Sequence, residues 1–457
     1  MPKPIIVIGG GVGGYSTAVR LSRAGKDVVV VEKRFLGGEC ANFGCIPTKV
    51  LYRYAYAARA LRELGLDIDL PALRVKSFAE ARRRAEQVRK GIEYLLDQAG
   101  VGVVHGVARI KTPNTVVIET HDGKRREVEF EKLIIATGTE PRSLPNLRID
   151  ERNVLSNRGL LSLEEPPSSV LIVGGGAIGI EMTSILKEMG VDVTVVEIMD
   201  RILPDMDPDV SRVLAQILKY RGIEILTRTS VSVVKEESDG RLRVLLSGGQ
   251  CRVVDKILLC VGRVPNTQGL NLDIAGVRVD ERGYIVTRIG NRTTNPNIYA
   301  VGDVTGPPLL AHKAILESKI VTDSIMARGE RELDRSVIPL AIFSLPEACS
   351  IGMREDEARE KCYGATAVVR IPVGAYPRAL VEGYRRGFVK VVMCRGRIVG
   401  LHAVGPLASE ICALGMELLL STLSPEDLSN RPEPHLTAAE ALRELADAIL
   451  GEPLHMA

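Results

Sequence analysis

The sequence predicts an α/β protein in which two similar strand–helix–strand units precede a C-terminal domain of α+β type. Two segments, residues 5–33 and 170–197, repeat one order of apolar strand, glycine loop, helix and strand. From about residue 336 the glycine loop is absent, and an expected hairpin is followed by helical periodicity. The length of 457 residues leaves room for about three domains at roughly 150 residues each.

The composition is that of a folded protein and disfavours several classes of function. Hydrophobic residues make up 45% of the chain and charged residues 26%, which is average for globular proteins. A net charge of +3 and an aromatic content of 4% without Trp predict no nucleic-acid-binding surface. The apolar runs are strand-sized, so neither a membrane span nor a targeting segment is expected. Eight cysteines are too few for a disulfide scaffold and predict a cytoplasmic protein.

The two repeated units share the same residue types at the same places. Apolar strands at 5–8 and 170–173 run into glycine loops, and strands at 27–31 and 192–196 end on an acidic residue. In the first unit the glycines and the acidic residue are Gly9, Gly11, Gly14 and Glu32. In the second they are Gly174, Gly176, Gly179 and Glu197. The acidic residue follows the middle glycine by 21 residues in both.

This pattern predicts two Rossmann-like dinucleotide-binding sites. The glycines let a pyrophosphate approach the backbone closely, the helix N-terminus offers free N–H groups, and the later carboxylate can accept hydrogen bonds from ribose hydroxyls. The alternative is a pair of glycine-rich packing turns. A carboxylate at Glu197 would repel a 2′-phosphate, so the second site is expected to prefer NAD to NADP. Alternatively, Glu197 is only an exposed carboxylate at the end of a strand.

The remaining elements follow from capping, alternation and turn signals. Ser77 and Glu80 have the spacing of a capping box and predict a helix from there to about Gln98, with the arginines at 82–84 on a solvated face. Antiparallel strands are expected at 101–104, 115–119 and 127–130, with a turn at 121–123. In the last third a hairpin is expected to join 387–393 to 397–404, with helices from Ser409 onward.

Cys40 and Cys45 follow the first unit directly, and their spacing makes them a redox candidate. On a regular α-helix two side chains five residues apart would point about 140° away from each other, which is poor geometry for a disulfide. Asn42 and Gly44 lie between them, tolerate unusual backbone angles and could supply the necessary distortion. A strained or exposed disulfide is readily reduced, as turnover requires.

Three other interpretations of this pair are ordinary buried thiols, one half of a zinc site and an inert disulfide. A zinc site needs about four ligands, and no second Cys or His pair lies nearby in the sequence, so no metal site is expected. For the other six cysteines, packing is the expected explanation. They are Cys251, Cys260, Cys349, Cys362, Cys394 and Cys412.

The cysteine segment 37–49 and three further motifs resemble those of the pyridine nucleotide-disulfide oxidoreductases. This resemblance covers essentially the whole chain. Residues 135–141 resemble the family's crossover out of its flavin domain, and residues 261–267 resemble the motif that returns to it. Residues 298–304, followed by 310–314, resemble the second flavin-binding segment.

The resemblance implies that the first unit binds FAD and the second binds NAD. The residues implied for FAD are Gly9, Gly11, Gly14, Glu32, Thr137, Gly138, Gly302, Asp303 and Ala311. Those implied for NAD are Gly174, Gly176, Gly179, Glu197 and Gly262. The implied domains are an FAD-binding domain in two parts, 1–141 and 267–335, an NAD-binding domain at 142–266 and a dimerisation domain at 336–457.

The resemblance also implies an activity. Electrons would pass from dihydrolipoamide, or a similar small dithiol, to the disulfide, then to the flavin and as hydride to NAD. Cys40 would exchange with the substrate and Cys45 would face the flavin ring. Lys49 and Glu181 would form an ion pair beside that ring. We therefore expect Cys40, Cys45, Lys49 and Glu181 to belong to the catalytic site.

A base is implied at His435, supplied by the partner subunit of a homodimer and oriented by Glu440. The alternative is that Thr437 and Glu440 form a capping box that opens the final helix. The chain departs from the family at Leu436, where the family usually has Pro.

Two other functions stay open: an NAD(P)H-dependent reductase of another small disulfide, and a flavoprotein that only senses redox state. A 2-oxoacid dehydrogenase complex is an expected partner.

Overall fold

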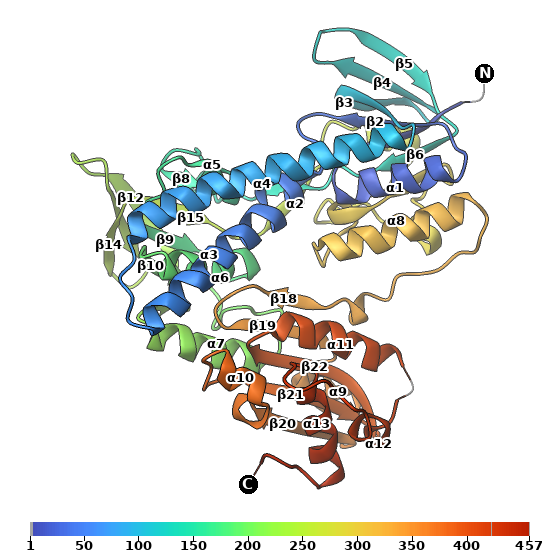
Figure 1. Ribbon diagram of the computed structural model, residues 1–457. Coiled ribbons are helices and arrows are strands. Elements are labelled where there is room, and N and C mark those ends of the chain that lie inside the picture. The colour runs from blue at the N-terminus through green and yellow to red at the C-terminus, as the bar shows by residue number, and fades with distance from the viewer. Residues whose placement is uncertain (1–2, 422, 457) are drawn as a thin grey trace.

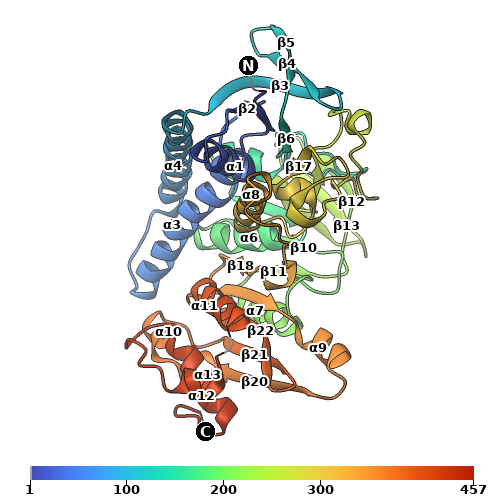
Figure 2. The same ribbon diagram turned by 90° about the vertical axis from the view of Figure 1, so that its right-hand side faces the viewer.

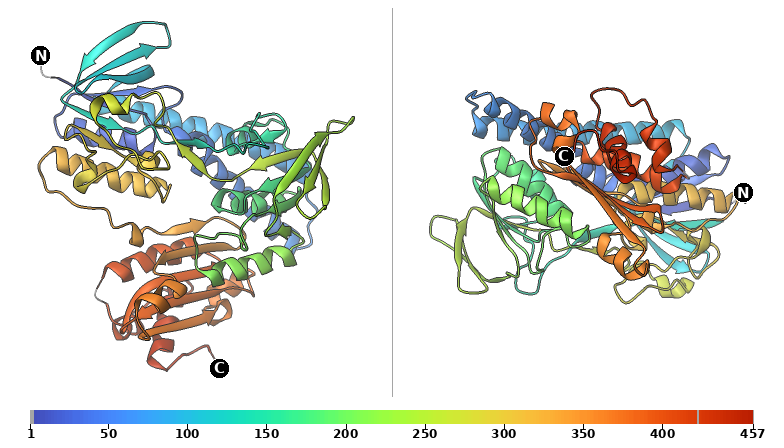
Figure 3. Two further views of the ribbon diagram at one scale, coloured as in Figure 1. Left: turned by 180° about the vertical axis from the view of Figure 1, so that it is seen from behind. Right: turned by 90° about the horizontal axis from the view of Figure 1, so that it is seen from below.

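A computed structural model describes residues 3–421 and 423–456, and the predicted fold class is confirmed. Figure 1 shows two α/β units side by side with the C-terminal domain below them. The same arrangement is seen from behind in the left panel of Figure 3, where the C-terminal domain is orange and red. Within the described residues, every helix is too short or too polar to cross a membrane.

The first unit is built on a seven-stranded sheet of order β17-β6-β1-β2-β3-β4-β5. Its strands are β1 (Ile5–Ile8), β2 (Val28–Glu32), β3 (Gly102–Thr112), β4 (Thr115–Thr120), β5 (Arg125–Glu129), β6 (Lys132–Ile135) and β17 (Ile298–Ala300). β1, β2, β6 and β17 are parallel and buried, while β3 turns into an antiparallel meander with β4 and β5. Its helices are α1 (Val12–Arg23), α2 (Gly38–Phe43), α3 (Cys45–Glu63), α4 (Leu70–Gln98) and α8 (Ala311–Ile325).

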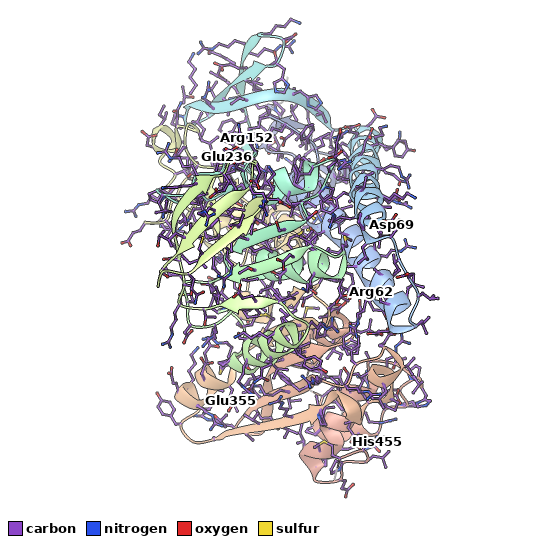
Figure 4. The ribbon with its side chains drawn as sticks, turned by 90° about the vertical axis from the view of Figure 1, so that its left-hand side faces the viewer. Arg62, Asp69, Arg152, Glu236, Glu355 and His455 are labelled. Carbon is purple, nitrogen blue, oxygen red and sulfur yellow. A yellow bond between two sulfur atoms is a disulfide. The ribbon has the colours of Figure 1, made fainter. Side chains whose placement is uncertain are left out.

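The second unit repeats the first around an all-parallel sheet of order β11-β10-β9-β15-β8. Its strands are β8 (Val154–Leu155), β9 (Ser169–Val173), β10 (Asp192–Val196), β11 (Glu224–Leu226) and β15 (Lys256–Leu259). Its helices are α5 (Asn157–Ser162), α6 (Ala177–Glu188) and α7 (Pro208–Tyr220). An antiparallel sheet of β12 (Val231–Glu236), β13 (Leu242–Leu246) and β14 (Cys251–Val254) covers one side. Arg152 and Glu236, which lie together in Figure 4, tie β12 to the start of this unit.

The chain crosses between the two units through a short antiparallel pair. This pair consists of β7 (Thr139–Pro141) and β16 (Arg263–Pro265). The return segment that follows contains the short 3₁₀ helices η1 (Leu272–Ala275), η2 (Ile289–Asn291) and η3 (Gly302–Thr305). Between η2 and η3 it adds β17 to the edge of the first sheet, so that unit is completed by residues from two distant parts of the sequence.

The C-terminal domain is an antiparallel sheet of order β18-β19-β22-β21-β20 with helices packed on it. Its strands are β18 (Leu340–Ile342), β19 (Glu347–Gly352), β20 (Thr366–Pro372), β21 (Phe388–Cys394) and β22 (Arg397–Gly405). Its helices are η4 (Arg335–Val337), α9 (Glu355–Lys361), η5 (Val373–Ala375), α10 (Pro377–Val381), α11 (Ala408–Leu420), α12 (Pro425–Ser429) and α13 (Glu440–Leu450). The predicted hairpin is confirmed as β21 and β22.

The start of α4 was predicted wrongly. The helix begins at Leu70, where the side chain of Asp69 caps it by accepting a 2.9 Å hydrogen bond from a backbone N–H. Ser77 lies inside the helix, fully buried, and donates to a main-chain carbonyl of the preceding turn. Glu80 is engaged by Arg83 and Arg84 on the exposed face. The capping-box spacing at 77–80 was therefore a coincidence. Asp69, followed by a proline in the first turn, is the stronger signal for the start of the helix.

The expectation that packing explains all six remaining cysteines was also wrong. Cys362, after α9, and Cys394, at the end of β21, form a disulfide with Cα atoms 5.8 Å apart. The bond ties the end of α9 to the end of β21, a strand that lies between β20 and β22, across 32 residues of sequence. Sequence spacing alone does not reveal such a pair, because the two strands that bring the cysteines together are separated by a long connection.

A buried charge cluster joins the second unit to the C-terminal sheet. Lys390 on β21 is 1% exposed and donates to Asp207 over 2.6 Å, to Asp209 over 3.0 Å and to Glu355 over 3.1 Å. Asp207 and Asp209 lie at the start of α7, and the fully buried His402 lies 3.8 Å from Asp207. The cluster therefore fixes how the second unit meets the C-terminal domain.

Candidate active site

A cavity of about 870 Å³ lies between the first unit, the crossover strands and helix α6. It brings together most residues that the sequence predicts for one cofactor: Gly9, Gly11, Glu32, Thr137, Gly138, Gly302, Asp303 and Ala311. It also brings together the four expected catalytic residues of this part of the chain, Cys40, Cys45, Lys49 and Glu181. Gly14 packs behind the loop, and the five residues expected for NAD lie outside this cavity, on the second unit.

Both glycine loops are shaped so that a side chain would block them. A Cβ at Gly14 would lie 1.9 Å from the carbonyl oxygen of Gly9, and one at Gly179 would lie 2.0 Å from that of Gly174. A Cβ at Gly176 would meet no protein atom within 4 Å. The outer glycines are thus needed for tight helix–strand packing, and the middle position faces open space that a pyrophosphate can occupy.

The acidic residue of each unit is bonded to its own glycine loop. Glu32 accepts hydrogen bonds from the backbone N–H groups of Gly10, over 2.6 Å, and Arg34, over 2.7 Å. Glu197 accepts equivalent bonds of 2.6 and 2.7 Å from Gly175 and Met199. Glu197 is 7% exposed, so it is not the exposed strand-end carboxylate of the alternative interpretation. These bonds fix both carboxylates beside the loops, where a ribose would lie.

The two crossover segments lock onto each other at the cavity wall. Thr137 donates its hydroxyl to the carbonyl of Asn266 over 2.8 Å, and the Asn266 amide donates back to the carbonyl of Thr137 over 2.9 Å. Beside them, the hydroxyl of Thr139 donates to Asp303 over 3.0 Å. Asp303 thereby presents a carboxylate to the cavity, which suits it to accept hydrogen bonds from the hydroxyls of a bound cofactor.

The cysteines lie where a helix is broken. α2 ends at Phe43 and α3 begins at Cys45, and Gly44 between them has non-helical backbone angles. A Cβ at Gly44 would lie 3.1 Å from a backbone oxygen of the preceding turn, so a larger residue would require that turn to shift by a few tenths of an ångström. The amide of Asn42 donates to the carbonyls of Leu36 and Gly38 and holds α2 in place. This break in the helix is the backbone distortion that a disulfide between Cys40 and Cys45 requires.

The two thiols differ in acidity. The thiol of Cys40 donates a hydrogen bond to Cys45, which raises the pKa of Cys40 and lowers that of Cys45. Burial adds to the rise at Cys40, and the ammonium group of Lys49 adds to the fall at Cys45. In the reduced protein a negative charge is therefore favoured on Cys45 over Cys40.

Lys49 and Glu181 form a well-defined ion pair beside the cysteines. The Nζ atom of Lys49 lies 2.9 and 3.0 Å from the two carboxylate oxygens of Glu181, which also accepts a 2.9 Å bond from the backbone N–H of Phe343. The same ammonium lies 4.3 Å from the centre of the Phe343 ring. The pair connects α3, α6 and the C-terminal domain at the cavity edge.

Comparisons with known proteins agree with this geometry over the whole chain. The family model "Pyridine nucleotide-disulphide oxidoreductase" matches residues 3–318, and the dimerisation-domain model of the same family matches residues 338–446. The chain belongs to the pyridine nucleotide-disulphide oxidoreductase family. As a member of this family, the oxidoreductase uses FAD and NAD as cofactors, and the dimerisation domain supports a homodimer.

Relatives of the oxidoreductase are similar to it over almost their full length. A dihydrolipoamide dehydrogenase from Chaetomium thermophilum is 35% identical, with 99% of this chain and 92% of the relative covered. A dihydrolipoyl dehydrogenase from Thermus scotoductus is 36% identical, with 99% and 97% covered. Among solved structures, the HOCl-induced flavoprotein disulfide reductase RclA from Escherichia coli has a TM-score of 0.88 at 29% identity, with 98% of this chain and 100% of that chain covered.

In the C-terminal domain of the oxidoreductase, His435 lies between α12 and α13, and Glu440 is the first residue of α13. Nδ1 of His435 lies 2.9 Å from Oε1 of Glu440, and the other carboxylate oxygen accepts a 3.1 Å bond from the backbone N–H of Thr437. The alternative of a capping box between Thr437 and Glu440 was wrong: Ala439 is the residue that precedes the helix, and among the described residues the Thr437 hydroxyl has no hydrogen-bond partner. The role of His435 as a base stays a prediction. The peptide bond between His435 and Leu436 is cis. The His435 side chain is 69% exposed, and Figure 1 shows α12 and α13 far from α2 within one chain.

Two groups at the cavity of the oxidoreductase carried no role in the sequence prediction. Lys313 and Glu317 are both fully buried, 3.2 Å apart, and hold the η3 loop through bonds to Gly302 and Thr305. Their spacing of four residues on a helix was a signal that could have been read. Their burial was not visible in the sequence.

The second group is an ion network beside the cysteine helix. Glu39, directly before Cys40, accepts two hydrogen bonds from Arg158 on α5, of 2.8 and 2.6 Å, and one from Asn157 of 2.7 Å. Arg263 lies 3.4 Å from the same carboxylate. This network clamps the start of α2 to the second unit and to the crossover, through contacts between residues more than a hundred positions apart.

Proposed function

We propose that the oxidoreductase transfers two electrons from dihydrolipoamide, or a similar small dithiol, to NAD. The dithiol becomes a disulfide, NAD⁺ becomes NADH, and one proton is released. The observation that carries this proposal is the Cys40–Cys45 pair at the wall of the cavity, with the negative charge favoured on Cys45. The names of the relatives supply the substrate class.

The unequal acidity of the two thiols gives the exchange a direction. A substrate thiolate that attacks a Cys40–Cys45 disulfide at the sulfur of Cys40 releases Cys45 as the thiolate, and the more acidic thiol is the better leaving group. The second substrate thiol then displaces Cys40 and closes the substrate disulfide. Attack at Cys45 would instead release the less acidic sulfur. Cys40 is therefore the sulfur that exchanges with substrate.

The residues present fit the two cofactors. Gly9, Gly11, Glu32 and Asp303 would hold FAD in the large cavity, with Thr137, Gly138, Gly302 and Ala311 completing its wall. Gly174, Gly176, Gly179, Glu197 and Gly262 would hold NAD on the second unit. Bound FAD would supply the two-electron transfer between the cysteine pair and nicotinamide. Lys49, paired with Glu181, keeps a positive charge beside Cys45.

A base for the substrate thiols comes from a second chain in this proposal. Nδ1 of His435 faces Glu440, so the exposed Nε2 is free to accept a proton. Because α12 and α13, which flank the His435 segment, lie far from α2 in Figure 1, the proton acceptor at Cys40 in this proposal is His435 of the partner subunit. The catalytic site is then complete only in the homodimer.

The second candidate function is NADH-dependent reduction of another small disulfide. The structural likeness to RclA, a flavoprotein disulfide reductase, favours it. Glu197, fixed beside the second glycine loop, favours NAD over NADP in either case. A protein that only senses redox state could use the Cys40–Cys45 pair but would not need the base at His435. Assembly into a 2-oxoacid dehydrogenase complex and a cytoplasmic location stay predictions from the sequence.

The test offers the purified holoenzyme reduced lipoamide with NAD and, separately, oxidised glutathione with NADPH. A clear preference for the second pair contradicts the proposal. The Cys45→Ser variant should lose dithiol-linked NAD reduction, because the disulfide cannot form. The control is Cys251→Ser, which removes an exposed cysteine on β14 and should retain activity. Persistent activity in Cys45→Ser would show that the pair does not carry the electrons.

A further inference from the structure

One side chain of the second unit, Asn157, reaches both ends of the cysteine helix α2. It is the first residue of α5, which contacts α2. Its place is fixed locally, because the hydroxyl of Ser156 caps α5 by accepting bonds from two backbone N–H groups and itself donates to Glu151 over 2.6 Å. Asn157 is 6% exposed and lines the same cavity as Cys40 and Cys45.

The amide nitrogen of Asn157 makes two hydrogen bonds at once. It donates to Oε1 of Glu39 over 2.7 Å and to the backbone carbonyl of Phe43 over 2.6 Å. A carboxylate and a carbonyl only accept hydrogen bonds, so these partners require the nitrogen of the amide and not its oxygen. Glu39 directly precedes Cys40, and Phe43 is the last residue of α2. One NH₂ group therefore bridges the two ends of the helix that carries Cys40.

The carbonyl of Phe43 cannot be satisfied within a helix. Its donor in a continuous helix would be the backbone N–H of residue 47, which is a proline and has none. Gly44, which follows Phe43, also has non-helical backbone angles and ends α2. The amide of Asn157 therefore supplies, from the other unit, the hydrogen bond that this break leaves unmade.

The two cysteine helices rest on the first unit, while α5 grips α2 from the second. α2 and α3 both pack against α4, and Figure 1 and Figure 2 show α3, which begins at Cys45, beside α4. The guanidinium group of Arg158 adds bonds of 2.8 and 2.6 Å to the Glu39 carboxylate and lies 6.0 Å from the centre of the Phe43 ring. The shape of α2 thus depends on contacts from the second unit.

We propose that Asn157 is a positioning residue for the dithiol centre, Cys40 and Cys45: its amide holds both ends of α2 where the disulfide between them closes. Both cysteines are free in the structure, and the backbone is already folded together here, since a Cβ at Gly44 would lie 3.4 Å from Cα of Cys40. Holding two thiols together raises their effective concentration and favours the disulfide over the dithiol. The inference rests on the proposed function, because it takes this pair as the one that cycles.

The test measures the thiol–disulfide equilibrium of the holoenzyme in anaerobic dithiothreitol buffers, without NAD. Closing the bond transfers two electrons and two protons from the cysteines to oxidised dithiothreitol, which becomes the dithiol. Asn157→Leu and Asn157→Asp keep the size of the side chain and remove the amide donor. In both, the ratio of reduced to oxidised dithiol centre should rise about tenfold, which is about 30 mV for a two-electron couple. Acid quenching, alkylation and mass spectrometry give the state of each cysteine pair.

The Cys362–Cys394 disulfide is a reference inside the same molecule. A variant that only loosens the fold would make both pairs easier to reduce, whereas loss of the Asn157 bridge should change the dithiol centre alone. The control, Asn114→Leu in the exposed turn between β3 and β4, should change neither pair. An unchanged dithiol centre in both Asn157 variants, or an equal shift of the two pairs, overturns the proposal.

The same measurement separates this proposal from the proposed function. If the dithiol centre of the parent protein forms no disulfide in any buffer, both are wrong. If the disulfide forms and the Asn157 variants leave its equilibrium unaltered, the proposed function stands and the positioning role is wrong. If the equilibrium shifts in the variants but the parent protein does not reduce NAD with a dithiol, the positioning role stands and the proposed function is wrong.

Discussion

Glu440, the first residue of the final helix, joins His435 to the backbone just before that helix: one carboxylate oxygen lies 2.9 Å from Nδ1 of His435 and the other accepts a bond from the N–H of Thr437. Burial alone would raise the pKa of Glu440, but these two bonds outweigh it and lower that pKa. The carboxylate is thus charged at neutral pH and fixes the orientation of the imidazole.

Replacing Glu440 with Gln should therefore slow thiol exchange. We expect kcat with the dithiol to fall by about 10- to 100-fold, because the imidazole loses its charged orienting partner. NADH-dependent reduction of a dye, which needs no thiol proton transfer, should fall much less. The control is Arg443→Gln, which removes a charge 3.5 Å from the Glu440 carboxylate and leaves that carboxylate in place. Equal losses in both reactions would place Glu440 in a purely structural role.

Removing the charge of Lys49 should shift the titration of Cys45. Lys49 lowers the pKa of the Cys45 thiol, so Lys49→Met should raise that pKa and reduce the thiolate fraction at neutral pH. The measurement is the rate at which iodoacetamide alkylates Cys45 in the reduced protein as a function of pH, with each cysteine followed by mass spectrometry. Lys49→Arg keeps the charge and should keep the profile. An identical profile in Lys49→Met would contradict the assignment.

The buried pair of Lys313 and Glu317 should control retention of FAD. Lys313→Met leaves the carboxylate of Glu317 buried without its cation, which costs about 3–5 kcal/mol, and frees the loop at Gly302. We expect a lower ratio of FAD to protein after purification and weaker rebinding of FAD to the stripped chain. Lys76→Met, an exposed position on α4, is the control. Full FAD content in Lys313→Met would show that the loop holds its shape without the pair.

Acid stability should depend on Lys390. Burial alone would raise the pKa of Asp209, but hydrogen bonds from Arg212 and Lys390 outweigh burial and hold it at about 2. A lowered carboxyl pKa contributes stability that is complete above the ordinary value near ~4 and is lost as the pH falls toward 2. Lys390→Met should raise this pKa and move the acid-unfolding midpoint to higher pH.

At neutral pH the same variant should lose about 3–5 kcal/mol of unfolding free energy, because Asp207 is left buried without its cation. Circular dichroism during acid and urea titrations gives both quantities. Lys361→Met on the exposed face of α9 should change neither. An unchanged midpoint in Lys390→Met would mean that the cluster contributes no net stability.

The local parts of the fold could be read from the sequence, because each depends on neighbours in the chain. The glycine loops, the carboxylates at 32 and 197 and the hairpin at 388–405 follow from spacing and alternation. The break at Gly44 follows from the geometry that two cysteines five residues apart require. The juxtaposition of Cys45, Lys49 and Glu181 came instead from the family resemblance, since Glu181 lies on the other unit.

The misses have one physical cause: they depend on contacts between distant residues. The Cys362–Cys394 bond, the clamp of Glu39 by Arg158 and the cluster around Lys390 each require strands and helices that meet only in the folded chain. The wrong start of α4 is different. There the local signal at Ser77 was real, but a stronger cap at Asp69 extended the helix past it.

The bond between Cys362 and Cys394 affects how this enzyme is handled at the bench. A dithiol in the assay mixture serves as substrate and is also a chemical reductant toward a second cysteine pair in the C-terminal domain. Freshly purified protein and protein stored in dithiothreitol are thus two different samples, and rates from one should not be pooled with rates from the other. Thiol counts in urea, taken before and after storage, distinguish them.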